Sequence, residues 1–155
     1  MLENQMESDK MIEISEADFL ELPEIAALER EIFPDAWSLK SLEETCKQKN
    51  AAIFVAKTKE GMAGYLIFYY VLEEGEIARI ATAHSVRRQG AASQMFRKLL
   101  DFCREQKITR IMLEVRENNE AARQFYGKCG FTKDGIRRNY YENPKENAVL
   151  MSVNL

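Results

Sequence analysis

One segment of the chain has the composition of an anion-binding loop, Arg87-Arg88-Gln89-Gly90-Ala91-Ala92-Ser93. Where a strand runs into a helix through small residues, backbone N–H groups can converge on a ligand without interference from side chains. The helix N-terminus adds partial positive charge, and the two arginines add full charges. The segment is therefore a candidate phosphate site, and the alternative is an ordinary turn with a surface arginine pair that could contact RNA. The absence of GxxxxGKS/T and GxGxxG motifs argues against a nucleotide P-loop and a dinucleotide fold.

Glu114 is the outstanding candidate for a proton acceptor. It interrupts the apolar residues Ile111-Met112-Leu113 and Val115, in a segment typical of a strand. A carboxylate among apolar neighbours is costly unless it is paired or reaches solvent through a cleft, and such environments are used to tune catalytic bases. The alternative is that Glu114 pairs structurally with Arg116 or with another arginine.

The composition indicates one globular domain. The chain has 155 residues, of which 46% are hydrophobic and 30% charged. Its net charge of −3 is unevenly spread, because residues 1–50 hold 13 acidic and 5 basic side chains and the remainder hold 12 and 17. This asymmetry fits a solvated acidic helix face. It fits equally an acidic side that attracts a cationic substrate and a basic side that holds an anionic cofactor.

The spacing of the cysteines, the single histidine and the short apolar runs predict a cytoplasmic protein without a bound metal. Cys46, Cys103 and Cys129 are widely spaced and are expected to be free thiols. With His84 as the single histidine and no CxxC or HxxxH motif, we expect no metal site. The longest uncharged apolar run, Met62–Leu72, is too short to span a bilayer. Residues 1–10 are expected to be a polar leader rather than a signal peptide, with the domain occupying residues 11–155.

The first half of the chain predicts two helices and then three strands. After a short strand at residues 11–14, Ser15 is expected to cap a helix that ends near Ile32. Pro23 lies inside this pattern, so the helix either starts after the proline or bends there. The Phe33–Ser38 segment breaks this helix, and Ser38 caps a second one that ends at about Lys47. The predicted strands are Ala51–Thr58, Met62–Leu72 and Glu76–Thr82.

The second half alternates between helices and strands. A long helix is predicted over Gly90–Gln106, followed by a strand at Ile108–Val115 that is expected to be buried on both faces. A helix over Asn119–Cys129 ends at Gly130, and the last strands are predicted near Phe131–Arg138 and Ala148–Asn154. The fold class is therefore α/β, a single domain with a mixed, mostly antiparallel sheet of about six to seven strands flanked by helices.

Several segments together resemble the GCN5-related N-acetyltransferase (GNAT) family. Arg87–Ala92 is similar to its pyrophosphate loop, and Ile77–Thr82 lies where its fourth strand meets acetyl-CoA. Further segments resemble the branch that acetylates protein N-termini, in particular the N-terminal alanine of a small-subunit ribosomal protein: Phe33-Pro34, Trp37-Ser38, Leu113–Asn119, Ala121-Ala122, Phe125-Tyr126, Gly130-Phe131 and Arg137–Tyr141. The likeness covers nearly the whole chain beyond residue 11. It departs from the family at Thr82-Ala83-His84, where Val-Asp-Pro is common.

The resemblance implies roles for individual residues. Glu114 would accept the proton of the amine through water, and Tyr126 would protonate the leaving sulfur or donate a hydrogen bond to it. Packing in the core is the alternative role for Tyr126. Backbone N–H groups near Ala81 would stabilise the oxyanion. The residues implied to bind acetyl-CoA are Ile80, Ala81, Thr82, Arg87, Arg88, Gln89, Gly90, Ala91, Ala92, Ser93 and Asn119, and Asn119 could also cap its helix.

A protein N-terminus as acceptor requires a binding groove. We expect it between the segments Phe33–Trp37 and Arg138–Tyr141. Tyr140 and Tyr141 offer rigid aromatic area with hydroxyl groups, which suits a peptide backbone, although packing on an edge strand is the alternative.

Other functions stay open at this point. The acceptor could be a lysine side chain, a polyamine or a small-molecule amine. A non-catalytic module that binds coenzyme A is a further alternative, and the presence of both Glu114 and Tyr126 argues against it. We expect no nucleic-acid partner, because the chain has no basic stripe, and no membrane partner. The expected state is a monomer or a weak homodimer.

Overall fold

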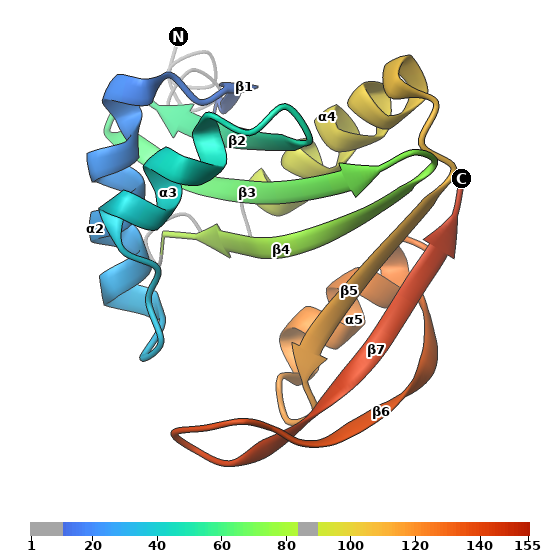
Figure 1. Ribbon diagram of the computed structural model, residues 1–155. Coiled ribbons are helices and arrows are strands. Elements are labelled where there is room, and N and C mark those ends of the chain that lie inside the picture. Colours follow the sequence, from blue (N-terminus) through green and yellow to red (C-terminus); the bar gives the residue numbers. More distant parts are fainter. Residues whose placement is uncertain (1–10, 84–89) are drawn as a thin grey trace, which may run out of the picture. The chain divides into compact units, whose positions relative to one another are not determined.

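The computed structural model describes residues 11–83 and 90–155 (Figure 1). The chain begins with β1 (Glu13–Glu16) and the 3-10 helix η1 (Phe19–Glu21), followed by α2 (Leu22–Ile32) and α3 (Leu39–Cys46). Three strands come next: β2 (Ala51–Thr58), β3 (Gly61–Val71) and β4 (Glu74–Thr82). The remaining elements are α4 (Ala91–Gln106), β5 (Arg110–Arg116), α5 (Glu120–Lys128), β6 (Thr132–Tyr141) and β7 (Glu146–Asn154).

Within the described residues, seven strands form a mixed sheet in the order β1-β2-β3-β4-β5-β7-β6. β4 and β5 run parallel, with Glu76 opposite Met112. β1 is antiparallel to β2, and β7 lies antiparallel between β5 and β6. The predicted α/β class, a mostly antiparallel sheet flanked by helices, is confirmed.

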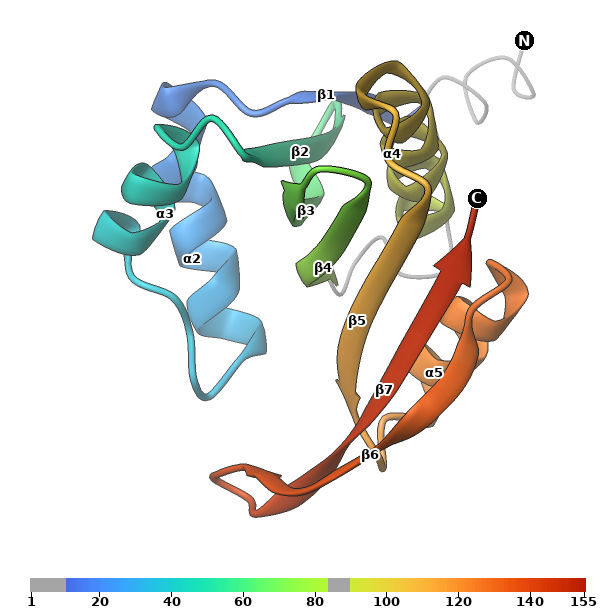
Figure 2. The same cartoon turned by 45° about the vertical axis from the view of Figure 1, so that its right-hand side comes forward.

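The chain divides into two compact units. The first unit comprises the described residues up to Phe68 together with Arg79–Phe102. In this unit, α2 and α3 cover one face of the strands and α4 covers the other (Figure 2). Phe102 makes edge-to-face contacts with Phe54 and Phe68, at centroid distances of 5.6 and 6.3 Å. An aromatic cluster between α4 and the sheet therefore forms part of the core of the first unit, and buried residues of α2 and α3 such as Leu22, Ile25 and Leu42 form another part.

The second unit comprises Tyr69–Ala78 and Cys103–Leu155. Burial alternates along β5, where Leu113 and Val115 are buried and Glu114 between them is partly exposed. The prediction that this strand is buried on both faces is wrong, because α5 covers one face of β5 and β7 (Figure 2). Consecutive buried residues occur instead in β3 of the first unit, at positions 63–68.

Local signals explain where most helices begin and end. The Ser38 hydroxyl accepts a hydrogen bond from the Ser41 N–H at 3.1 Å, so the predicted cap of α3 is confirmed. The prediction that Ser15 caps the first helix is wrong, because Ser15 lies in β1. The reciprocal side-chain bonds of a capping box form three residues later, between Asp18 and Glu21 at η1.

Candidate active site

The entrance of α4 has the backbone geometry expected of an anion site. Gly90 has a φ of +86°, in the left-handed region that favours glycine, and its carbonyl accepts from the Gln94 N–H at 3.0 Å. The first turn of α4 therefore directs its N–H groups toward this end of the helix. Ala91 is buried, Ala92 is half-buried and Ser93 is exposed. Arg87, Arg88, Gln89 and His84 lie outside the described residues.

The end of β4 belongs to the same unit. Ala81 is buried, and Ile80 and Thr82 are half-buried. Gly64 of β3 lies so close that a Cβ there would stand 2.5 Å from the Ala81 carbonyl oxygen. The Ala83 N–H donates to the Ala63 carbonyl at 2.7 Å. Contacts with β3 thus hold the backbone at this end of β4, where Ile80, Ala81 and Thr82 are predicted to meet acetyl-CoA.

Glu114 lies on β5 in the second unit, and its side chain is 22% exposed. Its Oε1 atom lies 3.5 Å from Nη1 of Arg137, so an arginine does pair with it, although not the Arg116 considered from sequence. Arg116 instead pairs with Glu146 at 3.2 Å. The Tyr140 hydroxyl hydrogen-bonds to Glu114, which raises the pKa of Tyr140. The carboxylate is therefore oriented by two partners and still reaches solvent.

A second carboxylate lies close to Glu114 in this unit. Glu76 of β4 is opposite Met112, two positions before Glu114 on the parallel strand β5. Desolvation by burial raises the pKa of Glu76 above its ordinary value of 4.5, and the charge of Glu114 raises it further, while Arg137 lowers it. Sequence reasoning did not identify Glu76, because its relation to Glu114 depends on the pairing of two strands.

Tyr126 is buried on α5, as its helical position predicted. Its ring contacts Phe125 and Phe131 at centroid distances of 5.5 and 5.6 Å. Burial raises the pKa of Tyr126 strongly, with smaller contributions from Cys129 and Tyr141. A phenol in this environment keeps its proton and is available as a hydrogen-bond donor.

Asn119 caps α5, since its side-chain oxygen accepts from the Ala122 N–H at 3.2 Å. The predicted capping role is therefore confirmed, and its contact with coenzyme A stays a prediction.

Aromatic and cationic side chains gather at the end of β6. The Tyr140 and Tyr141 rings are 5.0 Å apart, and Arg116 lies over Tyr141 at 4.4 Å. Tyr140 is exposed and Tyr141 is half-buried, while Arg138 is exposed. The ladder with β7 is irregular between Arg137 and Tyr141, which changes the alternation of side chains here.

Phe33 and Trp37, the predicted acceptor residues of the first unit, are both half-buried and flank the loop between α2 and α3. The guanidinium of Arg79 lies 3.8 Å from the Phe33 ring centroid and 5.9 Å from that of Trp37. Because Phe33 and Trp37 belong to one unit and Arg138–Tyr141 to the other, the groove predicted between these segments stays a prediction.

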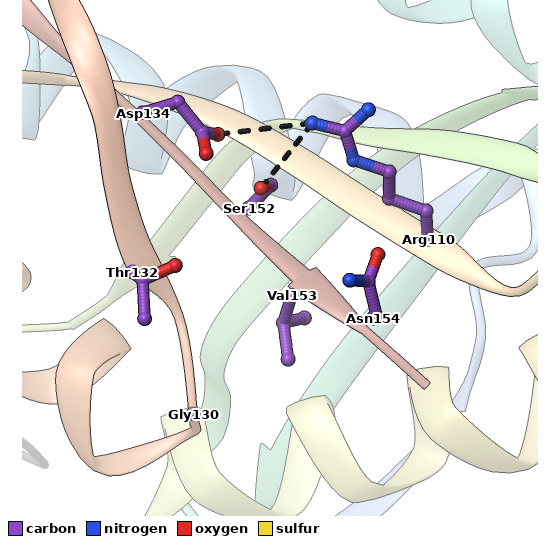
Figure 3. A pocket seen from close by; sticks show the side chains of 7 residues that line it. All are labelled: Arg110, Gly130, Thr132, Asp134, Ser152, Val153 and Asn154. Atoms are coloured by element: carbon purple, nitrogen blue, oxygen red, sulfur yellow. Dashed lines mark hydrogen bonds and ion pairs between the residues drawn. The ribbon is translucent and has the colours of Figure 1, made fainter.

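A surface pocket of the second unit contains none of the predicted site residues. It is lined by Arg110, Gly130, Thr132, Asp134, Ser152, Val153 and Asn154 (Figure 3). The Arg110 guanidinium lies 3.9 Å from the Asp134 carboxylate and 3.4 Å from the Ser152 hydroxyl (Figure 3). The arginine charge is already paired in this pocket, which makes it a poor site for an anion.

The described part of the chain contains neither a metal-binding cluster nor a membrane-spanning helix. There, no cluster of three or more histidine, cysteine or acidic side chains could hold a metal ion. None of the helices in residues 11–83 and 90–155 is long and apolar enough to cross a membrane. Cys46, Cys103 and Cys129 are free thiols.

Comparison with known proteins decides the family. Residues 22–131 match the model of the acetyltransferase (GNAT) family. The chain belongs to the GNAT family. This acetyltransferase is 31% identical over 145 residues to the ribosomal protein bS18-alanine N-acetyltransferase of Haemophilus influenzae, with coverage of 92% of this chain and 98% of the relative.

Two further comparisons agree with this result. The acetyltransferase is 29% identical over 136 residues to the putative ribosomal protein bS18-alanine N-acetyltransferase of Bacillus subtilis, covering 87% of this chain and 90% of that protein. The crystal structure of the ribosomal-protein-S18-alanine N-acetyltransferase from Escherichia coli superposes with a TM-score of 0.85 at 29% identity, covering 93% of this chain and 94% of the other.

Sequence reasoning missed a buried acid in the first unit of this acetyltransferase. Glu29 is fully buried and binds Arg79 of β4. A signal for it existed, because Glu29 follows Leu22 and Ile25 at the helical spacing of core residues. An acid at such a position indicates a buried partner of opposite charge.

Proposed function

We propose that this acetyltransferase transfers the acetyl group of acetyl-CoA to the N-terminal α-amino group of a protein, and that its acceptor is the N-terminal alanine of a small-subunit ribosomal protein. The choice of acceptor rests on the likeness to the Haemophilus influenzae enzyme named for that reaction, which extends over nine tenths of both chains. Glu114, a partly exposed carboxylate held by Arg137, supports the chemistry.

The start of α4 fits the diphosphate of coenzyme A. Gly90 adopts a backbone conformation that favours glycine, directly before a helix of 16 residues. N–H groups and the dipole at such a helix start favour an anion. Arg87 and Arg88, which precede Gly90 in the sequence, supply positive charge. Ile80–Thr82 would meet the thioester, with a backbone N–H near Ala81 as donor to the oxyanion.

Glu114 has the role of proton acceptor. An α-amino group has a pKa of about 8 and is mainly protonated at neutral pH, so it must lose a proton before it can attack. Glu114 accepts this proton directly or through water. The nitrogen lone pair then attacks the thioester carbonyl, and the C=O π electrons move to oxygen to form the oxyanion. When the oxyanion collapses, the C–S bond breaks, its electron pair leaves on sulfur, and the second nitrogen proton is released to solvent.

Tyr126 has the role of stabilising the leaving sulfur. Because burial raises its pKa, Tyr126 stays protonated and its hydroxyl donates a hydrogen bond to the developing thiolate. Transfer of the whole proton is disfavoured by the same shift. The alternative role in the core is compatible with this one, since the ring packs against Phe125 and Phe131.

The test uses purified protein, acetyl-CoA and two peptides. One peptide begins with a free alanine and has no lysine, and the other is blocked at its N-terminus and contains one lysine. We expect thiol release and an added acetyl group with the first peptide alone. Equal turnover of both peptides would contradict the proposed acceptor, and no turnover of either would contradict the activity.

Two variants separate chemistry from binding. Glu114→Gln should retain affinity for acetyl-CoA in calorimetry and lose roughly 100- to 10,000-fold in turnover, the usual contribution of an acid–base group. Glu105→Gln, an exposed acid on α4, is the matched control and should keep full turnover. Unchanged turnover in Glu114→Gln would remove this residue from its proposed role.

A further inference from the structure

Glu29 is a buried carboxylate that the proposed chemistry does not use. Its side chain is 0% exposed, and its two oxygens accept four hydrogen bonds. Oε1 accepts from the Tyr65 hydroxyl at 2.5 Å and from Arg79 Nε at 2.8 Å. Oε2 accepts from Arg79 Nη2 at 3.1 Å and from the Trp37 backbone N–H at 2.9 Å. The last of these bonds connects α2 to the loop that leads into α3.

Arg79 makes further contacts with the same loop. Its Nη2 atom donates to the backbone carbonyl of Asp35 at 3.1 Å and lies 3.4 Å from the Asp35 carboxylate. Its guanidinium lies 3.8 Å from the centroid of the Phe33 ring. The Glu29–Arg79 pair thus contacts the Phe33–Ser38 loop at three residues, through backbone bonds, an ion pair and an aromatic face.

The contacts of this pair indicate a role beyond filling the core. A buried ion pair adds little stability over well-packed apolar residues, because both charges must lose their water. Two hydrogen bonds of the pair, from the Trp37 N–H to Glu29 and from Arg79 to the Asp35 carbonyl, involve loop backbone, which apolar residues could not bind. Arg79 also lies two residues before Ala81 on β4, so it joins the loop to the strand end predicted to meet the thioester.

We propose that Glu29 and Arg79 are positioning residues that hold the Phe33–Ser38 loop in the conformation that recognises the acceptor peptide. They set the affinity for the peptide and contact neither the reacting atoms nor coenzyme A. This inference rests on the proposed function for the identity of the acceptor. The fixation of the loop itself does not depend on that function.

Trp37 allows the loop to be observed without catalysis, because it is the single tryptophan of the chain. The first test variant is Glu29→Gln, in which an NH2 donor faces the groups that donate to Glu29 in the wild type. The second is Arg79→Lys, which keeps the positive charge but loses the planar guanidinium with its paired N–H donors. Glu31→Gln and Arg30→Lys are the matched controls, since both are exposed neighbours on α2.

We expect both test variants to shift Trp37 emission to longer wavelength and to increase its quenching by acrylamide. The KM for the alanine peptide should rise roughly tenfold, as expected for loss of a charge-assisted hydrogen bond, while the KM for acetyl-CoA stays within about twofold. The controls should match the wild type in all three measurements. Arg79→Lys keeps a cation beside Glu29, and this leaves a folded variant if Glu29→Gln does not fold.

Three outcomes would overturn the inference. The first is unchanged Trp37 emission and quenching in folded Arg79→Lys. The second is a changed emission with an unchanged peptide KM. The third is an equal rise of both KM values with a loss of thermal stability, which indicates a purely structural role. Absence of peptide acetylation by the wild type would overturn the proposed function, and the fluorescence measurements would still decide whether the pair fixes the loop.

Discussion

Arg137 reaches across a whole strand to Glu114. Its Nη1 atom lies 3.5 Å from Oε1 of Glu114, although β7 separates β6 from β5 in the sheet. The Arg137 side chain is half-exposed and also lies over the Tyr140 ring at 5.0 Å. A cation is thus held beside the carboxylate to which we assign proton transfer.

Replacement of Arg137 should move the pH dependence of turnover. In Arg137→Gln the positive charge that lowers the pKa of Glu76 is lost, so Glu76, the carboxylate beside Glu114, takes up its proton at higher pH. The acid limb of the pH–rate profile should therefore move to higher pH, by less than about one unit because the ion pair is half-exposed. Profiles of kcat from pH 5 to 9 would measure this, and a shift to lower pH would contradict it.

Glu76 should reduce stability at neutral pH. Although Glu76 is exposed, desolvation and the charge of Glu114 raise its folded-state pKa, so the folded protein loses stability relative to the unfolded chain as rising pH ionises the group. We expect Glu76→Gln to unfold at higher denaturant concentration than the wild type at pH 7, with the difference shrinking toward pH 4. A difference independent of pH would show that the carboxyl does not titrate as described.

Tyr126→Phe should separate hydrogen bonding from packing. Phenylalanine keeps the ring contacts with Phe125 and Phe131 and removes only the hydroxyl. We expect kcat to fall roughly a hundredfold, the usual effect of losing one donor to developing charge, with little change in thermal stability. Stopped-flow measurement of thiol release would test this. A large loss of stability with normal turnover would assign the hydroxyl to the core.

Gly64→Ala should damage the end of β4. The added Cβ would stand 2.5 Å from the Ala81 carbonyl oxygen, so the strand must shift, and we expect a loss of about 1–3 kcal/mol in the free energy of unfolding together with lower turnover. Gly127→Ala is the control, because a Cβ there meets nothing within 4 Å. It should raise stability by up to about 1 kcal/mol. Urea titrations of both variants would show the difference.

Two of the three thiols, Cys103 and Cys46, should differ in reactivity toward an alkylating reagent. Burial raises the pKa of Cys103 to about 12, so almost no thiolate exists at pH 8. We expect an alkylating reagent to label Cys103 only after denaturation, whereas partly exposed Cys46 reacts in the native protein. Peptide mapping by mass spectrometry would measure the labelling. Rapid native labelling of Cys103 would contradict its burial.

Several elements could be predicted because their signals are local. The bounds of β2 agree with the prediction at both ends, since a hairpin turn at Lys59-Glu60 follows the strand directly. Ser38 and Asn119 cap the helices that they were expected to cap, because a short polar side chain can reach only the N–H groups of the next turn. Gly130 follows the end of α5 with a φ of +97°, a backbone conformation that glycine adopts readily after the last turn of a helix.

Burial and pairing were less accessible from the sequence. An apolar run does not tell how many faces of a strand are covered, and so β5 was expected to be buried on both sides. Glycine is typical of turns, yet Gly75 lies inside β4 opposite Ile111. Its place in the strand depends on pairing with residues far along the chain.

The sequence alone determined the family, the order of helices and strands, and the candidates Glu114 and Tyr126, because each depends on residue types at short spacing. Tertiary structure decided which charges meet: Arg137 with Glu114, and Arg79 with Glu29, fifty residues earlier in the chain. Such partners are brought together by sheet pairing and helix packing. Their identity is a property of the folded chain, because no local spacing encodes it.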